Sequence, residues 1–133
     1  MRGSCLCGQV VYSVERLASA PRHCSCNTCR KAHAAAFNTS ASVQRAEFQW
    51  LRGESLLSSF ESSPGKRRYF CSVCGSQLIA HRSGSENIAL RVATLDEDPE
   101  QKPKAHVWIS SEVPWLAYGS DVTPFEGWDS GAS

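Results

Sequence analysis

The stretch His23-Cys24-Ser25-Cys26-Asn27-Thr28-Cys29-Arg30-Lys31 places three cysteines within six residues and follows them with two basic residues. A single tight turn can bring three thiolates this close onto one metal ion. Three ligands are one fewer than a closed tetrahedral zinc site requires, so one coordination position would stay open for a reacting molecule. The sequence therefore predicts a metal centre with an open position.

Four further cysteines form two short motifs, Cys5-x-Cys7 and Cys71-x-x-Cys74. These are zinc-knuckle spacings, and the odd total of seven cysteines argues against a disulfide framework. A secreted disulfide scaffold with one spare thiol is the alternative reading. We expect zinc sites in a protein of the reducing cytoplasm.

Spacing alone permits two partitions of these cysteines. In the first, Cys5, Cys7, Cys71 and Cys74 close a four-thiolate site, helped by the glycines that follow each pair. In the second, Cys26-x-x-Cys29 joins Cys71-x-x-Cys74 as an ordinary zinc ribbon and three cysteines are left over. The spacing does not choose between them.

Length and charge limit the remaining possibilities. A chain of 133 residues is suited to one domain, so we expect residues 1–133 to form a single zinc-binding unit. The net charge of +1 provides no general attraction to nucleic acid or to a membrane surface. We find no apolar run of about 20 residues and no signal-peptide core after Met1, so we expect neither membrane insertion nor export.

Short alternating segments separated by turn residues predict a mainly β fold. Asn27 is expected to cap one brief helix from Thr28 to about Ala34. We interpret Lys66-Arg67-Arg68 as the exposed edge of a strand, and the aromatic residues Trp115, Tyr118, Phe125 and Trp128 as pinning a tail to the body. The expected strands cover residues 8–14, 22–24, 37–43, 48–51, 56–60, 66–70, 77–81, 87–93 and 106–109.

Three motifs in order carry a resemblance to a known family. They are Cys5-Leu6-Cys7-Gly8, the stretch from His23 to Lys31, and Arg68-Tyr69-Phe70-Cys71-Ser72-Val73-Cys74-Gly75-Ser76. Together with His106-Val107-Trp108, Pro114-Trp115 and Pro124-Phe125, they resemble the glutathione-dependent formaldehyde-activating enzyme family, which also contains centromere protein V. The chain is similar to the short members of that family.

The resemblance implies a fold and a partition of the cysteines. The family fold is a β-tent of packed antiparallel sheets, stapled here by zinc. Carried over, a structural zinc is held by Cys5, Cys7, Cys71 and Cys74, and a catalytic zinc by Cys24, Cys26 and Cys29. The second zinc would be the more labile of the two, because it has fewer protein ligands.

The charge of a three-cysteine site indicates which molecule completes it. Zinc with three thiolates carries one net negative charge, so it should acidify bound water less than a three-histidine site does. A soft thiol suits this metal and would be held as its nucleophilic thiolate. We therefore expect a carbon-sulfur lyase or synthase acting on the adduct of a thiol, such as glutathione, with a small aldehyde such as formaldehyde.

Other residues near the motif are candidates for lesser roles. Arg30 and Lys31 are candidate substrate contacts that offset negative charge, or else a solvated helix face. Trp108 is either a wall of the ligand cleft or part of the core. His23 would make the second site structural if it were a fourth ligand, but neighbouring residues on a strand point apart.

Two other function classes compete with the lyase. A non-catalytic zinc module that binds a protein or a nucleic acid would hold both zincs firmly and without an exchangeable ligand. A methionine sulfoxide reductase of the B type would need a free redox cysteine, and none remains after four plus three ligands. The sequence is compatible with a monomer or a homodimer.

Overall fold

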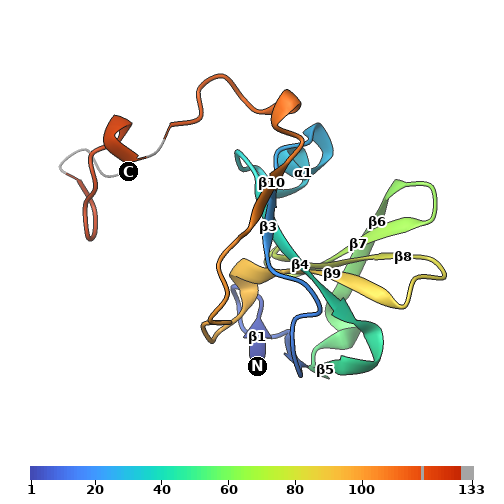
Figure 1. Cartoon of the computed structure of the whole chain (residues 1–133). Coiled ribbons are helices and arrows are strands. Elements are labelled where there is room, and N and C mark those ends of the chain that lie inside the picture. The colour runs from blue at the N-terminus through green and yellow to red at the C-terminus, as the bar shows by residue number, and fades with distance from the viewer. Residues whose placement is uncertain (118, 130–133) are drawn as a thin grey trace.

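The computed structural model describes residues 1–117 and 119–129, and it is mainly β with one α-helix in that part of the chain (Figure 1). The strands are β1 Arg2–Ser4, β2 Val11–Val14, β3 Arg22–Cys24, β4 Asn38–Gln44, β5 Phe48–Arg52, β6 Leu57–Ser63, β7 Lys66–Cys71, β8 Gln77–Arg82, β9 Asn87–Arg91 and β10 Ala105–Val107. The helix is α1 Asn27–His33. Single turns of 3-10 helix cover Arg45–Glu47, Glu54–Leu56, Val92–Thr94, Ile109–Ser111 and Gly119–Asp121.

The strands form two sheets. The smaller has the order β1-β2-β5, and the larger has the order β10-β3-β4-β9-β8-β7-β6. Neighbouring strands are antiparallel, except that β10 runs parallel to β3 at the edge of the larger sheet. This confirms the predicted mainly β fold of antiparallel sheets with one short helix.

Side chains from both sheets form the core. Tyr12 of β2 is fully buried, and its ring stacks on Phe48 at a centroid distance of 5.3 Å. Strands β4 and β9 supply Ala41 opposite Leu90 and Val43 opposite Ile88, all four buried in the same cluster as Tyr12. The apolar face of the larger sheet therefore packs on the smaller sheet.

The opposite face of the larger sheet is polar at one end. Directly opposed residues on antiparallel strands point to the same side, so Ser40 of β4 shares a side with Arg91 of β9. Arg68 of β7 lies opposite Ala80, and Ala80 lies opposite Ala89. Because side chains alternate along a strand, Arg68 and Arg91 face the same side, away from Leu90.

The predicted helix cap was wrong. Cys26 occupies the cap position, and its Sγ accepts a hydrogen bond from the Cys29 N–H at 3.3 Å, while Asn27 is the first helical residue. The Cys26 sulfur takes the place of the side-chain oxygen of a usual N-cap residue, because it points back toward Cys29, the third cysteine of the motif. The helix ends at His33, and the C-cap residue Ala34 adopts a left-handed conformation with φ 47°.

Two expectations about side-chain exposure were also wrong. Strand β7 lies between β6 and β8 rather than at an edge, and Arg68 is only 4% exposed. The tail after β10 runs away from the sheets, and Trp115, Phe125 and Trp128 are exposed, because Tyr12, Phe48 and Trp50 already fill the aromatic core (Figure 1). Tyr118 lies outside the described residues.

Strand β1 was not predicted. Three residues without apolar alternation gave no strand signal, although Gly3 pairs with Tyr12 and bridges to Leu95. A separate finding concerns membranes: within residues 1–117 and 119–129, no helix is long and apolar enough to cross a bilayer.

Candidate metal centres

The structure gathers the cysteines into two groups that could hold metal ions, and neither group draws on the other's motif. Cys5, Cys7, Cys71 and Cys74 form one group and Cys24, Cys26 and Cys29 form the other, each with all sulfurs within 4.8 Å of one another. The ribbon partition of Cys26 and Cys29 with Cys71 and Cys74 is not the one that the fold brings together. Four thiolates, or three thiolates with one further ligand, suit the tetrahedral coordination of zinc.

The four-cysteine group joins the N-terminal turn to the β7–β8 turn. Its sulfurs approach closely, with Cys5 3.5 Å from Cys7 and Cys7 3.9 Å from Cys71. The Val10 N–H donates to the Cys5 sulfur at 3.3 Å. Such amide donors stabilise thiolate charge, so the turn is already arranged for deprotonated ligands.

Small residues after each cysteine pair make this geometry possible. Gly8 and Gly75 have φ values of 75° and 79°, in the left-handed region that disfavours side chains. The Ser76 hydroxyl lies 3.3 Å from the Cys74 sulfur and lowers the pKa of that thiol to about 5. Ser76 also accepts the Leu6 N–H at 3.0 Å, which ties the two turns together.

The three-cysteine group is built from one strand end and one helix start. Cys24 ends β3, where it is paired with Asn38 of β4 on one side and Val107 of β10 on the other. Cys26 caps α1, and Cys29 lies in its first turn and is buried. The strand pairing therefore fixes one sulfur and the helix fixes the other two.

A buried arginine lies against this group. Arg68 Nη2 donates to the Cys29 sulfur at 3.7 Å, and its Nε donates to Ser62 Oγ at 3.0 Å. Burial raises the pKa of the Cys29 thiol, but the hydrogen bond from Arg68 and those with Cys26 and Cys24 outweigh it, so the pKa is lowered overall. Burial raises the pKa of Cys24 to about 11. The Cys29 thiol therefore loses its proton more readily than the Cys24 thiol.

A second arginine, Arg91, lies on the same side of the sheet and is 5% exposed. Burial lowers its pKa to about 10, with Arg68 adding to the shift and the three thiols of the cluster opposing it. A zinc ion with three thiolates carries one negative charge, and a fourth thiolate would make it two. The two buried guanidinium groups together carry two positive charges, which equal in size the negative charge of zinc with four thiolates.

The predicted substrate contacts lie around the cluster with different exposure. Arg30 Nε donates to the Ser25 carbonyl at 3.1 Å, and Lys31 is exposed on the helix. Trp108 is 62% exposed, has φ 60° and directly follows Val107, the partner of Cys24. The core reading of Trp108 was therefore wrong.

His23 is not part of either sulfur group. Its Nδ1 is hydrogen-bonded to Thr39 Oγ1 at 2.8 Å, and its ring lies 4.3 Å from that of Phe37. His106 is likewise hydrogen-bonded to a residue outside the sulfur groups, because its Nε2 is 2.7 Å from the Oγ of the fully buried Ser25. Both histidines hold the β3 strand in place.

Sequence reasoning missed Arg68 and Arg91 as members of the site. Arg91 alternates with Ile88 and Leu90 and so reads as a solvent-facing position, and Arg68 sits in a run of cations. One signal was available, because Arg68 opens the quoted motif that ends in the Cys71 turn. Arg68 contacts Cys29 of α1, and Arg91 lines the same cavity as His33 of α1. No pattern in β7 or β9 reports these contacts with the helix.

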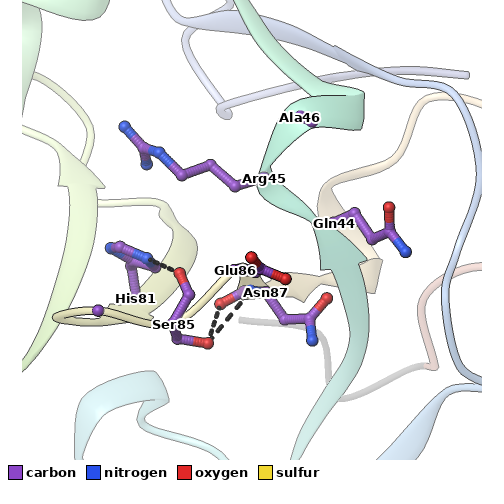
Figure 2. Close-up of a pocket in the computed structure, with 8 residues that line it drawn as sticks. Gln44, Arg45, Ala46, His81, Ser85, Glu86 and Asn87 are labelled. Carbon is purple, nitrogen blue, oxygen red and sulfur yellow. Dashed lines mark hydrogen bonds between the residues drawn. The ribbon is translucent and has the colours of Figure 1, made fainter.

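A larger hollow of about 830 Å³ lies at the other end of β4 and contains no cysteine. Figure 2 shows Arg45 reaching across it and His81 donating through Nε2 to the Ser85 carbonyl, at 2.8 Å. β4 spans Asn38, beside the three-cysteine group, to Gln44 in this hollow, which is about 20 Å of strand. The hollow is therefore separate from both metal centres.

The chain is similar to known proteins over most of its length. A model of the family described as glutathione-dependent formaldehyde-activating enzyme matches residues 1–111. The fold matches the crystal structure of a Rhodobacter sphaeroides protein with a TM-score of 0.64 and 26% sequence identity, covering 77% of this chain and 98% of that one. No curated protein gives a significant match.

Proposed function

Because the chain belongs to the glutathione-dependent formaldehyde-activating enzyme family, we propose that it is a zinc-dependent carbon-sulfur lyase that makes or breaks the adduct of a thiol and a small aldehyde. Cys24, Cys26 and Cys29 are the ligands of the catalytic zinc, and the thiol is its fourth ligand. Cys5, Cys7, Cys71 and Cys74 hold a structural zinc. Residues 1–133 act as one unit.

The observation that carries this proposal is the buried contact between Arg68 and Cys29. A three-thiolate site needs cationic partners if it is to accept a further thiolate, and Arg68 and Arg91 supply two positive charges below it. Zinc bound there would keep the cosubstrate sulfur deprotonated near neutral pH. The donor set, one open position and two buried cations all favour a thiol over water.

The reaction is an addition and its reverse. In synthesis, the thiolate sulfur attacks the carbonyl carbon, a C–S bond forms, and the carbonyl π electrons move to oxygen, which takes a proton from solvent. In lysis, the hydroxyl gives up that proton, the C=O bond re-forms and the C–S bond breaks. In this scheme the thiol sulfur lies near Cys29, and Trp108, whose side chain is exposed, is proposed to border the approach of the aldehyde. No oxidant or reductant is needed.

The proposal is tested by removing one ligand. Cys26→Ala should abolish exchange between glutathione, formaldehyde and S-hydroxymethylglutathione, followed by two-dimensional NMR exchange spectroscopy on zinc-loaded protein. Thr28→Ala is the matched control, because Thr28 is exposed on the same turn and ligates nothing. Unchanged exchange in Cys26→Ala would contradict the lyase.

A second candidate is a zinc module that binds a partner without catalysis. The exposed Trp115, Phe125 and Trp128 favour it, since aromatic residues are enriched at interfaces. Metal analysis separates the two functions. Two zincs, one of which is displaced or altered by glutathione, would support the enzyme, whereas two zincs indifferent to glutathione would support the module.

A further inference from the structure

A cavity of about 390 Å³ is lined by residues that follow Cys29 and Cys74 in the chain, among them His33 and Ser76. It is bordered by the last turn of α1, the start of β4, the start of β8 and the end of β9. Its volume falls within the range of small-molecule sites and exceeds what one or two waters would fill. The lining residues that matter most are His33, Gln77 and Arg91.

Three of these lining side chains have buried polar atoms without a partner. They are Nε and Nη2 of Arg91, Nε2 of His33 and Oε1 of Gln77. An unsatisfied buried donor or acceptor is costly, and such groups cluster where a ligand completes them. Three of them around one cavity indicate a built site rather than a packing defect.

The geometry of Arg91 selects the ligand. Nε and Nη2 form one edge of the guanidinium group, and two parallel N–H donors on one edge match the two oxygens of a carboxylate. Arg91 itself is 5% exposed, so a carboxylate that reached it would be paired away from bulk water. Gln77 Oε1 is an acceptor and would take an N–H from the same ligand.

Charge around the cavity also favours an anion. Burial, with the positive charges of Arg91 and Arg68, lowers the pKa of His33 to about 4, so the imidazole is neutral at pH 7. The side chains that line the cavity include no carboxylate. Arg91 also acts on the three thiols of Cys24, Cys26 and Cys29. One side chain therefore links the cavity to the metal cluster.

We propose that this cavity is the anchoring site for a carboxylate of the thiol cosubstrate, with Arg91 as its bidentate partner and Gln77 as acceptor for an adjacent amide N–H. The inference rests on the proposed function and deepens it. It restricts the cosubstrate to carboxylate-bearing, peptide-like thiols and excludes simple neutral thiols. Arg91 is a specificity-determining residue that does not touch the bond that forms or breaks.

The test compares ligands that differ in one property. Zinc-loaded protein is titrated by calorimetry with glutathione, with its diethyl ester, which keeps the thiol and blocks both carboxylates, and with S-methylglutathione, which keeps the carboxylates and blocks the thiol. We expect glutathione to bind about 10-fold or more tighter than the diester, as a charge-assisted bidentate pair predicts. In Arg91→Gln this ratio should fall to about 1.

Lys102→Gln is the control for general attraction by cations, because Lys102 is exposed and does not line the cavity. It should leave the ratio within about twofold of the unmodified protein. Arg91→Lys keeps the positive charge but loses the two parallel N–H donors of the guanidinium group. It should therefore restore only part of the preference for glutathione over its diester. Circular dichroism and zinc content confirm that each variant is folded and loaded.

The outcomes separate the anchoring site from the lyase. A ratio unchanged in Arg91→Gln would overturn the anchoring site and leave the lyase intact. S-methylglutathione should bind in an Arg91-dependent way even if no exchange reaction is detected, in which case the lyase alone fails. S-methylglutathione binding that is absent, or that ignores Arg91, would overturn the anchoring site.

Discussion

Arg68 Nη2 lies 3.7 Å from the sulfur of Cys29, and both residues are buried. The pair joins β7, the strand next to the β6 edge of the larger sheet, to the first turn of α1. A guanidinium group held against a thiolate lowers the cost of keeping that sulfur deprotonated. Metal ligands depend on such partners for both affinity and orientation.

Arg68→Gln should weaken zinc binding at the three-cysteine group by about 10- to 100-fold, the usual loss when a residue behind a ligand is removed. The four-cysteine group should be unaffected. Competition with a chromophoric chelator resolves the two sites. Arg67→Gln is the matched control, because Arg67 is exposed and its Nε bonds to Ser59 Oγ at 3.0 Å. Equal loss from both variants would contradict the role of Arg68.

Cys71→Ser should destabilise the fold far more than Cys26→Ser. Cys71 is fully buried in the core cluster, and its group ties the N-terminal turn to the β7–β8 turn. Structural zinc contributes apparent binding energy of about 10–16 kcal/mol, so losing that site should remove cooperative unfolding. Thermal melts followed by circular dichroism provide the measurement. A normal melt for Cys71→Ser would show that this site does not support the fold.

Ser25→Ala should reduce the free energy of unfolding by about 1–3 kcal/mol, the cost of leaving a buried polar group without its partner. The group is Nε2 of His106, 2.7 Å from Ser25 Oγ. Urea denaturation measures the change, with Ser72→Ala as control because Ser72 is exposed. If both variants denature at the same urea concentration, the Ser25–His106 bond does not stabilise the edge of the sheet.

His33 should make stability fall with acidity. Burial, with help from Arg91 and Arg68, lowers its pKa to about 4 from an ordinary 6.5. Between these two pH values the imidazole of His33 is protonated in the unfolded chain but neutral in the folded protein. The free energy of unfolding therefore decreases as pH falls from 6.5 toward 4. Above pH 7 the effect is absent.

The difference between unmodified protein and His33→Gln isolates this contribution, because acid also protonates the cysteine ligands in both proteins. Unfolding by urea at several pH values should give curves that converge above pH 7 and separate below 6.5, with His33→Gln less sensitive to acid. Parallel curves throughout would show that the imidazole is not excluded from its charged form.

The sequence predicted what depends on local pattern. The three cysteine motifs, the mainly β composition and the helix after Cys26 are all local, and the structure has each of them. Which cysteine groups form depended on the family resemblance, since knuckle spacing alone permits both a ribbon and the observed grouping. The spacing of the cysteines predicts that they bind metal, but it does not predict which cysteines share one ion.

Features that depend on the third dimension were missed. Arg68 looked like a surface cation because its neighbours Lys66 and Arg67 are also cationic, yet the register with Ala80 turns it toward α1. Arg91 was overlooked because it alternates with the apolar Ile88 and Leu90, which reads as a solvent-facing position. The aromatic residues of the tail were predicted to pack on the sheets because large aromatic residues are usually buried. That rule does not take into account that Tyr12, Phe48 and Trp50 already fill the aromatic core.

The parallel pairing of β10 with β3 has a consequence for synthesis of the chain on the ribosome. Ala105–Val107 must have left the exit tunnel before β3 can gain its outer neighbour and before the Ser25 N–H can reach the Val107 carbonyl at 3.1 Å. The four-cysteine group needs the nascent chain only as far as Cys74. The sheet edge beside Cys24 is therefore completed only after every residue of the four-cysteine group has been synthesised.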